Sequence, residues 1–257
     1  MRFGVCVKTV EEIGVLAEAG FDFCELPAAS ILPFEDDRAA EPTLRAFEAA
    51  PLRSESFNVL VPGSLPLAGP EVDPDTVRGY FERVFPRMAR LGAQVAVLGS
   101  GAARRIPDGW PRERALDQLA EDLKLAGDTA ARSGIELCLE HLNRTETNVF
   151  NSVAECQGFI ETRGLSSVRL LADLHHLAME HEPFAHVVAA APHLTHVHVA
   201  DGGRRAPGVG GYDYAGFMAA LRQMGYDRRI SAECSWENLA DQARDAGQFM
   251  RRMWAQA

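Results

Sequence analysis

The sequence lacks any long apolar segment. No run of apolar residues approaches the roughly 20 that a membrane-spanning helix needs. The first residues, Met1-Arg-Phe-Gly-Val-Cys-Val7, lead into the charged Lys8 and Glu11, unlike the apolar stretch of a secretory signal peptide. We therefore expect neither export nor a membrane anchor.

Positive charge and cysteine are also scarce. Lys and Arg total 26 against 36 Asp and Glu, which gives a formal net charge of −10. This balance argues against nucleic acid and anionic membranes as partners, because both attract clustered Lys and Arg. The 5 cysteines are odd in number and show no CxxC spacing, so we interpret them as reduced thiols. We expect a cytoplasmic protein that acts on a small molecule.

A glycine-rich nucleotide-binding turn, a linker and low-complexity tracts are absent as well. The first predicted strand is followed by Lys8-Thr9-Val10, so it carries no dinucleotide fingerprint. We therefore expect one domain over residues 1–257.

Eight short apolar runs have the length of β-strands, and a segment with helical periodicity follows each one. Several of these segments end beside glycine, as at Ala19-Gly20 and Ser133-Gly134, where a left-handed residue can close a helix. Strict alternation favours a parallel sheet, and eight units in about 250 residues predict an α/β fold, a single (β/α)8 TIM barrel. An open doubly wound sheet is the alternative. The predicted strands are Arg2–Val7, Phe21–Leu26, Glu55–Val61, Gln94–Gly99, Ile135–Glu140, Val168–Asp173, Leu194–Ala200 and Arg229–Glu233. The predicted helices are Val10–Ala19, Glu41–Ala50, Asp75–Leu91, Arg112–Ser133, Ser152–Thr162, Pro183–Ala191, Tyr214–Met224 and Asn238–Trp254.

Four predicted strands in the second half of the chain end in a side chain that can bind a metal. They are Leu137-Cys-Leu-Glu140, Leu170-Leu-Ala-Asp173, Thr195-His-Val-His198 and Ile230-Ser-Ala-Glu233. The carboxyl ends of barrel strands meet at one mouth, so three carboxylates and one imidazole should converge there. Such a set suits Mn²⁺, Mg²⁺ or Co²⁺, and Zn²⁺ is also compatible with it.

A metal in this mouth would polarise a substrate carbonyl and stabilise the enediolate formed when the adjacent C–H bond loses its proton. Glu140 and Glu233 belong to the fifth and eighth strands. They could therefore approach a bound sugar from opposite faces, one removing a proton and the other returning it.

The histidines leave a choice open. We expect the two-residue period of a strand to turn one of His196 and His198 into the barrel and the other outward, and the spacing does not select between them. His175 and His176 present the same choice. A single acid at a strand end is usually a loop cap or an ion-pair partner, but three acids and a histidine at the ends of four successive strands favour a site.

Several motifs together resemble the xylose isomerase-like barrel superfamily, and within it the ketose 3-epimerases and their hydroxypyruvate isomerase relatives. They are Glu140-His-Leu-Asn-Arg-Thr-Glu146, Asp173-Leu-His-His176, His196-Val-His198-Val-Ala-Asp-Gly-Gly-Arg204, Pro207-Gly-Val-Gly210 and Glu233. The ketose 3-epimerase motif usually reads Glu-Pro-Leu-Asn-Arg-aromatic-Glu, whereas this chain has His141 and Thr145 at the proline and aromatic positions.

The resemblance implies roles for particular residues. The metal ligands would be Glu140, Asp173, His198 and Glu233, with Glu140 and Glu233 also acting as the catalytic acid/base pair. Substrate oxygens would be held by Glu146, His176 and Arg204. The resemblance thereby selects His198 and His176 among the histidines, and it implies a homodimer or homotetramer.

Two loops have competing interpretations. The segment Asp201–Gly211 is either a flexible surface connection or a mouth loop whose arginine contacts substrate oxygens. In Ser100–Asp108, either Arg104 or Arg105 contacts a substrate phosphate or carboxylate, or the loop is simply solvated.

The predicted function is that of a divalent-metal-dependent isomerase or epimerase of a sugar or sugar phosphate, working through a cis-enediolate. Ketose 3-epimerisation and aldose–ketose isomerisation are both compatible with the residues. One alternative is a metal-dependent dehydratase of a cyclic polyol or keto acid, of the inosose or dehydroshikimate type. A sugar-binding accessory subunit is another, although both glutamates needed for catalysis are present. Abasic-site endonucleases share the barrel but need more histidines and a basic face.

Overall fold

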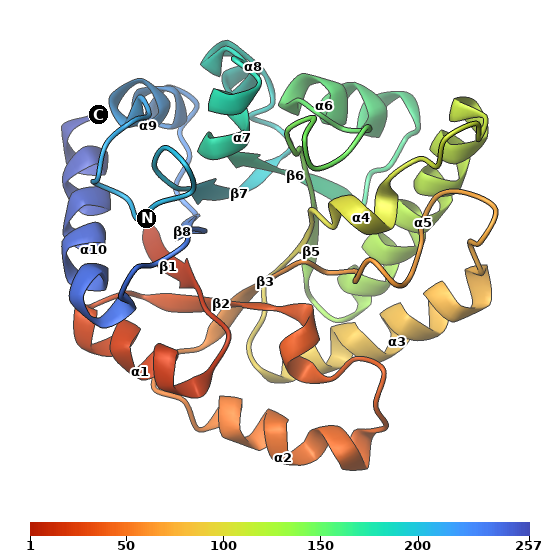
Figure 1. Cartoon of the computed structure of the whole chain (residues 1–257), viewed down its shortest axis with the longest axis horizontal. Helices are drawn as coiled ribbons and strands as arrows, with labels where there is room; N and C mark the ends of the chain where they lie inside the picture. The colour runs from red at the N-terminus through yellow and green to blue at the C-terminus, as the bar shows by residue number, and fades with distance from the viewer.

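The computed structural model describes residues 1–257. Eight parallel strands form a closed barrel in chain order, and β8 pairs with β1 (Figure 1). This architecture confirms the predicted α/β class and the (β/α)8 barrel. The strands are β1 (Arg2–Cys6), β2 (Phe23–Pro27), β3 (Ser54–Asn58), β4 (Val95–Leu98), β5 (Glu136–Glu140), β6 (Val168–Asp173), β7 (Leu194–Val199) and β8 (Arg229–Ala232).

Helices surround the barrel (Figure 1). The first, α1, begins with a capping box in which Thr9 and Glu12 bond each other's backbone, and it ends at Gly20 with φ 85°. Gly134, predicted to close another helix, has φ 72°. The helices that overlap predicted helical segments are α1 (Val10–Ala19), α2 (Asp37–Glu48), α3 (Pro74–Arg90), α5 (Arg112–Arg132), α6 (Val153–Thr162), α8 (Phe184–Ala189), α9 (Tyr214–Gln223) and α10 (Leu239–Gln256).

Three short helices follow strands directly at the mouth and were predicted as loops. They are η1 (Ala28–Ile31), α4 (Gly101–Arg104) and α7 (Leu174–Met179). Segments of four to six residues are too short to show a helical period, so the sequence pattern carries no signal for them. Their effect is to place the residues after β2, β4 and β6 in ordered turns beside the strand ends.

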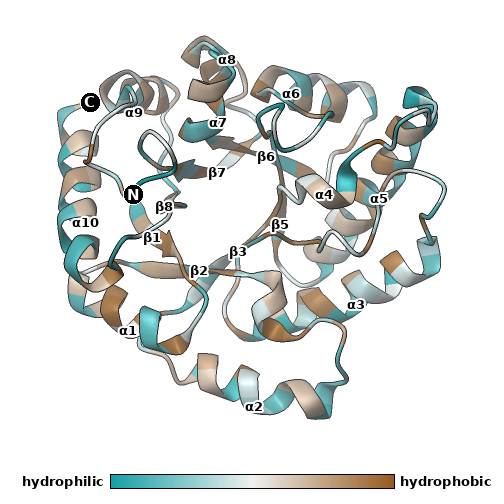
Figure 2. Ribbon diagram, viewed as in Figure 1, coloured by the Kyte–Doolittle hydropathy of each residue, from teal (hydrophilic) through white to brown (hydrophobic).

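The main apolar core lies between the strands and the surrounding helices. A single cluster of 65 buried residues fills this layer. In Figure 2 the helices carry both brown and teal residues, as expected for elements with one buried face. The strands also carry both colours, because polar side chains lie in the barrel interior. All five cysteines are free. None of the helices combines the length and the apolar character needed to cross a membrane.

The barrel interior is divided into an apolar and a polar part. On one side, Cys138 of β5 lies 3.0 Å from the Thr195 hydroxyl of β7, a contact that crosses the interior because these strands are not neighbours. A second apolar cluster of four residues, which includes Cys138, lies apart from the main core. On the other side, Glu25 of β2 accepts a hydrogen bond from His196 of β7 at 2.8 Å. The polar part lies directly below the carboxyl ends of the strands.

Gly4 allows the Phe23 ring to lie inside the barrel. A Cβ at Gly4 would stand 2.4 Å from Phe23 Cε2, and Phe23 is fully buried. We expect Gly4→Ala to destabilise the fold by about 1–3 kcal/mol, because the ring has no free space to move into. Gly14 in α1 has nothing near its Cβ position, so Gly14→Ala should stabilise by about 0.5–1 kcal/mol. Urea unfolding of both variants measures the difference, and equal stabilities would contradict this account.

Candidate metal and active site

Four side chains from successive strands meet at the mouth. Glu140 and Asp173 are the last residues of β5 and β6, His198 lies near the end of β7, and Glu233 directly follows β8. One ligand atom from each lies within 4.8 Å of those from the other three. His198 Nδ1 is 3.3 Å from Glu140 Oε1 and 3.6 Å from Glu233 Oε2. The structure therefore brings together the four residues predicted to bind a metal.

Three of these side chains carry a buried polar atom that no hydrogen bond satisfies. The atoms are Glu140 Oε1, Asp173 Oδ2 and His198 Nδ1. Buried polar atoms are nearly always paired in folded proteins, so three unpaired atoms converging from three strands need a common partner. Two carboxylate oxygens and an imidazole nitrogen are ligands of hard to borderline divalent cations. The donor set fits such an ion.

Both histidines of β7 point into the barrel, which corrects the prediction that one of them points outward. His196 and His198 each donate from Nε2 to the carboxylate of Glu25, at 2.8 Å. Residues two positions apart share a face of a strand, so the two-residue period places them together and does not separate them. Sequence reasoning also missed Glu25, although a glutamate inside the apolar run Phe23–Leu26 is itself a signal of a polar interior.

The two glutamates of the mouth have opposite electrostatic environments. Burial, together with the charge of Glu233, raises the pKa of Glu140 to about 7, against the lowering effect of His198. Burial also opposes ionisation of Glu233, but His198 and Arg204 outweigh it and hold the Glu233 pKa below its usual value. Asn58, at the end of β3, donates to Glu233 Oε1 at 3.0 Å. Glu233 is thus held as a carboxylate, while Glu140 holds a proton near neutrality in the metal-free protein.

The three residues predicted to hold substrate oxygens lie next to this cluster. Arg204 donates to Glu233 Oε2 at 2.6 Å and lies 3.5 Å from Glu146 Oε1. A second Arg204 nitrogen lies 2.9 Å from Nε2 of His176. His176 Nδ1 accepts the backbone N–H of Asn143 at 3.0 Å, so the neutral ring carries its proton on Nε2. Two donors therefore lie side by side, and one oxygen acceptor within reach of both could accept from each.

The glycine-rich loop after β7 is anchored and presents Arg204 to the mouth. The buried carboxylate of Asp201 accepts backbone N–H groups from Gly208 and Gly210 at 2.8 and 2.9 Å. Arg204 takes a left-handed conformation with φ 55°, which turns its side chain toward Glu233. Of the two interpretations of this loop, the structure supports an ordered mouth loop.

Two departures from the ketose 3-epimerase motif have structural roles. His141, which replaces a proline, accepts the backbone N–H of Asp173 at its Nε2, at 3.1 Å. Burial lowers the His141 pKa to about 3, so the ring remains neutral and keeps this acceptor. The Thr145 hydroxyl donates to Asn143 Oδ1, and so does its backbone N–H at 3.0 Å, which closes the turn before Glu146. Both substitutions thus support neighbouring site residues.

Arg104 is neither solvated nor available to a substrate, contrary to the interpretations of its loop. It is fully buried and donates to the backbone carbonyls of Leu98 and Glu140 at 3.1 and 2.6 Å. Arg105 is exposed and donates to the carbonyl of Glu146 at 2.9 Å. Arg104 therefore holds the ends of β4 and β5 together, which supports the position of Glu140.

Comparisons with known proteins agree with the resemblance found in the motifs. The chain matches the family model described as xylose isomerase-like TIM barrel over residues 13–253. It is 32% identical over 234 residues to the L-ribulose 3-epimerase of Methylomonas sp., covering 88% of this chain and 78% of that protein. It is 28% identical over 245 residues to the D-psicose 3-epimerase of Agrobacterium fabrum, covering 90% and 79%. A crystal structure of D-psicose 3-epimerase in the presence of D-fructose matches with a TM-score of 0.85 at 21% identity, over 99% of both chains, which shows the common fold.

The raised pKa of Glu140 predicts a cost in stability for the metal-free protein. A glutamate whose folded pKa rises from 4.5 to about 7 favours folding only while protonated, so its contribution is lost as the pH rises through 7. We expect Glu140→Gln to stabilise the metal-free protein at pH 8 by about 1–3 kcal/mol, and to have little effect at pH 4.5. Urea unfolding at both pH values measures this. The exposed Glu237→Gln is the control, and a less stable Glu140→Gln at pH 8 would contradict the expectation.

Proposed function

Because the chain belongs to the xylose isomerase-like TIM barrel family, we propose that it is a divalent-metal-dependent sugar epimerase or isomerase. The observation that carries this proposal is the convergence of Glu140, Asp173, His198 and Glu233, with three unpaired buried atoms, beside the donors Arg204 and His176. The similar proteins named as L-ribulose and D-psicose 3-epimerases support a ketose as substrate and carbon 3 as the reacting centre.

Glu140, Asp173, His198 and Glu233 would hold the metal. Mn²⁺, Mg²⁺ and Co²⁺ suit this mixture of carboxylate and imidazole, and Zn²⁺ is also compatible with it. When bound, the ion supplies positive charge that polarises the substrate carbonyl and stabilises the negative charge left by proton removal.

Glu233 is the first base in this mechanism. Its pKa lies below the usual value, so it is ionised over the whole working pH range and can take the proton from the carbon next to the carbonyl. The product of this step is a cis-enediolate. Glu140 belongs to β5, across the mouth from the end of β8, and returns a proton to the opposite face. Removal of the carbon-3 proton and its return to carbon 3 from the opposite face gives the 3-epimer. Removal of a carbon-1 proton and its return to carbon 2 instead gives the aldose.

Arg204, His176 and Glu146 orient the sugar. Arg204 and the Nε2–H of His176 donate to one substrate oxygen, which relieves the contact between these two donors at 2.9 Å. Glu146 Oε1 accepts from Asn143 Nδ2 at 3.0 Å, and its carboxylate can accept a substrate hydroxyl proton. These contacts fix the plane of the carbon skeleton relative to the two glutamates.

Proton NMR in D₂O with the Mg²⁺-loaded protein tests the proposal directly. The panel holds ketoses, keto acids and sugar phosphates. Deuterium at carbon 3 of a ketose is the expected result, and deuterium at carbon 1 or 2 would instead assign aldose–ketose isomerisation. Loss of water with a new ultraviolet enone band would assign a dehydratase. Absence of exchange from every compound, with metal bound, would refute the proposed activity.

Replacing the proposed base should stop the reaction without unfolding the protein. We expect Glu233→Gln to reduce the rate of deuterium incorporation by about 10²–10⁴-fold, because the amide cannot accept the proton. The matched control is Glu237→Gln, because Glu237 lies on the same loop but is exposed. Wild-type turnover in Glu233→Gln would show that the proton-transfer pair is assigned wrongly.

Metal removal should abolish activity and lower stability together. After dialysis against EDTA we expect no exchange, and recovery with Mn²⁺, Mg²⁺ or Co²⁺. Metal at about 100 times its Kd should stabilise the fold by about 2.7 kcal/mol, seen as a higher Tm. Asp173→Asn keeps the side-chain oxygen that caps α7 but loses the negative charge that attracts the metal. Added metal should therefore raise the Tm of this variant by less than it raises the Tm of the wild-type protein. Full activity in EDTA would contradict metal dependence.

A further inference from the structure

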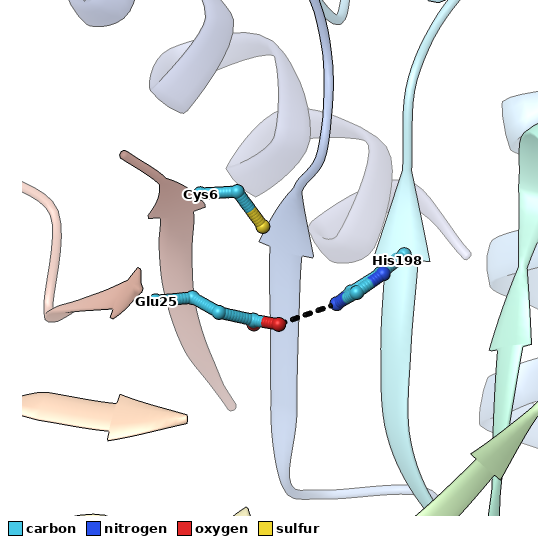
Figure 3. A group of neighbouring side chains, drawn as sticks. All are labelled: Cys6, Glu25 and His198. Carbon is cyan, nitrogen blue, oxygen red and sulfur yellow. Dashed lines mark hydrogen bonds and ion pairs between the residues drawn. The ribbon is translucent and has the colours of Figure 1, made fainter. Parts of the chain in front are cut away.

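Glu25 of β2 points toward His198 of β7 inside the barrel (Figure 3). Its two carboxylate oxygens have different partners. Oε2 accepts three hydrogen bonds, from the Ser56 hydroxyl at 2.6 Å, the Ser231 hydroxyl at 2.6 Å and His196 Nε2 at 2.8 Å. Oε1 accepts one, from His198 Nε2 at 2.8 Å. Glu25 is fully buried. Three donors thus lock the carboxylate in place and leave one oxygen for His198.

The opposite nitrogen of His198 faces the mouth. Nδ1 has no hydrogen-bond partner and lies 3.3 Å from Glu140 Oε1. A neutral imidazole has one N–H group and one lone pair, and the hydrogen bond at one nitrogen decides which nitrogen is free. Whenever His198 is neutral, the Nε2–H donated to Glu25 leaves the Nδ1 lone pair directed to the other ligands.

We propose that Glu25 is a positioning residue of the metal site, which fixes both the ring orientation and the tautomer of His198. The inference rests on the metal site of the proposed function. Metal-binding histidines commonly donate their second N–H to a carboxylate, and loss of that partner typically weakens metal binding 10–100-fold. Glu25 is itself held by its other donors. Its Oε2 atom is fixed by Ser56, His196 and Ser231, which directs Oε1 toward His198.

Cys6 of β1 stands beside this pair (Figure 3). Its sulfur, a Glu25 oxygen and a His198 nitrogen lie within 4.8 Å of one another, a grouping that also occurs in metal sites. His198 Nε2 is already hydrogen-bonded to Glu25, however, and burial together with the Glu25 charge raises the pKa of the Cys6 thiol well above its usual value. Because the Glu25 and His198 atoms of this grouping already bond each other, we assign it no ion of its own.

The substitution Glu25→Gln tests the proposal sharply. The three donors at Oε2 select the carboxamide oxygen, which turns the NH₂ group toward His198 Nε2 and favours the wrong tautomer. Mn²⁺ affinity is measured from the electron paramagnetic resonance signal of free Mn²⁺. We expect the Kd to rise 10–100-fold in Glu25→Gln and by less than about twofold in the control Glu237→Gln, which makes the same change at an exposed position. Wild-type affinity in a folded Glu25→Gln would overturn the proposal.

A second measurement needs no variant. In ¹⁵N NMR of the Mg²⁺-loaded wild-type protein, His198 should be a neutral ring with its proton on Nε2. A proton on Nδ1, or a wild-type protein that binds no Mn²⁺, would overturn the inference. Neither readout involves a sugar. If Glu25→Gln weakens Mn²⁺ binding while no sugar exchanges deuterium, the positioning role stands and the proposed activity fails.

Discussion

Repulsion among carboxylates is the constraint on which the mouth of this barrel depends. Glu140, Asp173 and Glu233 bring three acidic groups within 4.8 Å, in a place where little water is available to screen them. His198 and Arg204 supply the positive charge nearest to them. Burial and the charge of Glu233 account for the raised pKa of Glu140, and attraction to Glu233 draws Arg204 inward. A divalent cation would relieve the remaining repulsion. The crowding of carboxylates that lowers the stability of the fold therefore also creates affinity for the cation.

The outer architecture was predictable because it follows from local patterns. The bounds of α1 and β6 agree with the structure to the residue, since each combines a clear apolar pattern with a strong end signal. Once the strands alternate with helices, the topology alone places Glu140, Asp173 and Glu233 at one mouth. The short helices after β2, β4 and β6 were missed because their stabilisation comes from the strand ends beneath them and not from a pattern of their own.

The interior of the barrel was not predictable in the same way. The contacts of Glu25 with His196 and His198 join strands that are not neighbours, so neither pairing register nor periodicity reports them. Arg104 resembles a mouth residue by position, yet its guanidinium bonds backbone carbonyls, a role that depends on the exact path of two strands. The choice of His198 over His196 came from family resemblance. The physical reason for this choice is that the His198 ring lies nearer the mouth than the His196 ring. The alternation of side chains along a strand does not report this difference, because both residues face the interior.

The hydrogen bonds of Glu25 also bear on how the chain folds. Ser56 is 31 residues from Glu25 along the chain, but Ser231 is 206 residues away. Contacts between residues so far apart along the chain form late in folding. The entropy cost of closing a long loop must be met before the contact contributes any stabilisation. A carboxylate buried before β7 and β8 are in place would lack three of its four donors, which is strongly unfavourable, so we expect the burial of Glu25 to be completed only when β8 docks against β1. The barrel is therefore sealed and its mouth assembled in the same final event, and a chain still lacking its last strand has no site to fill.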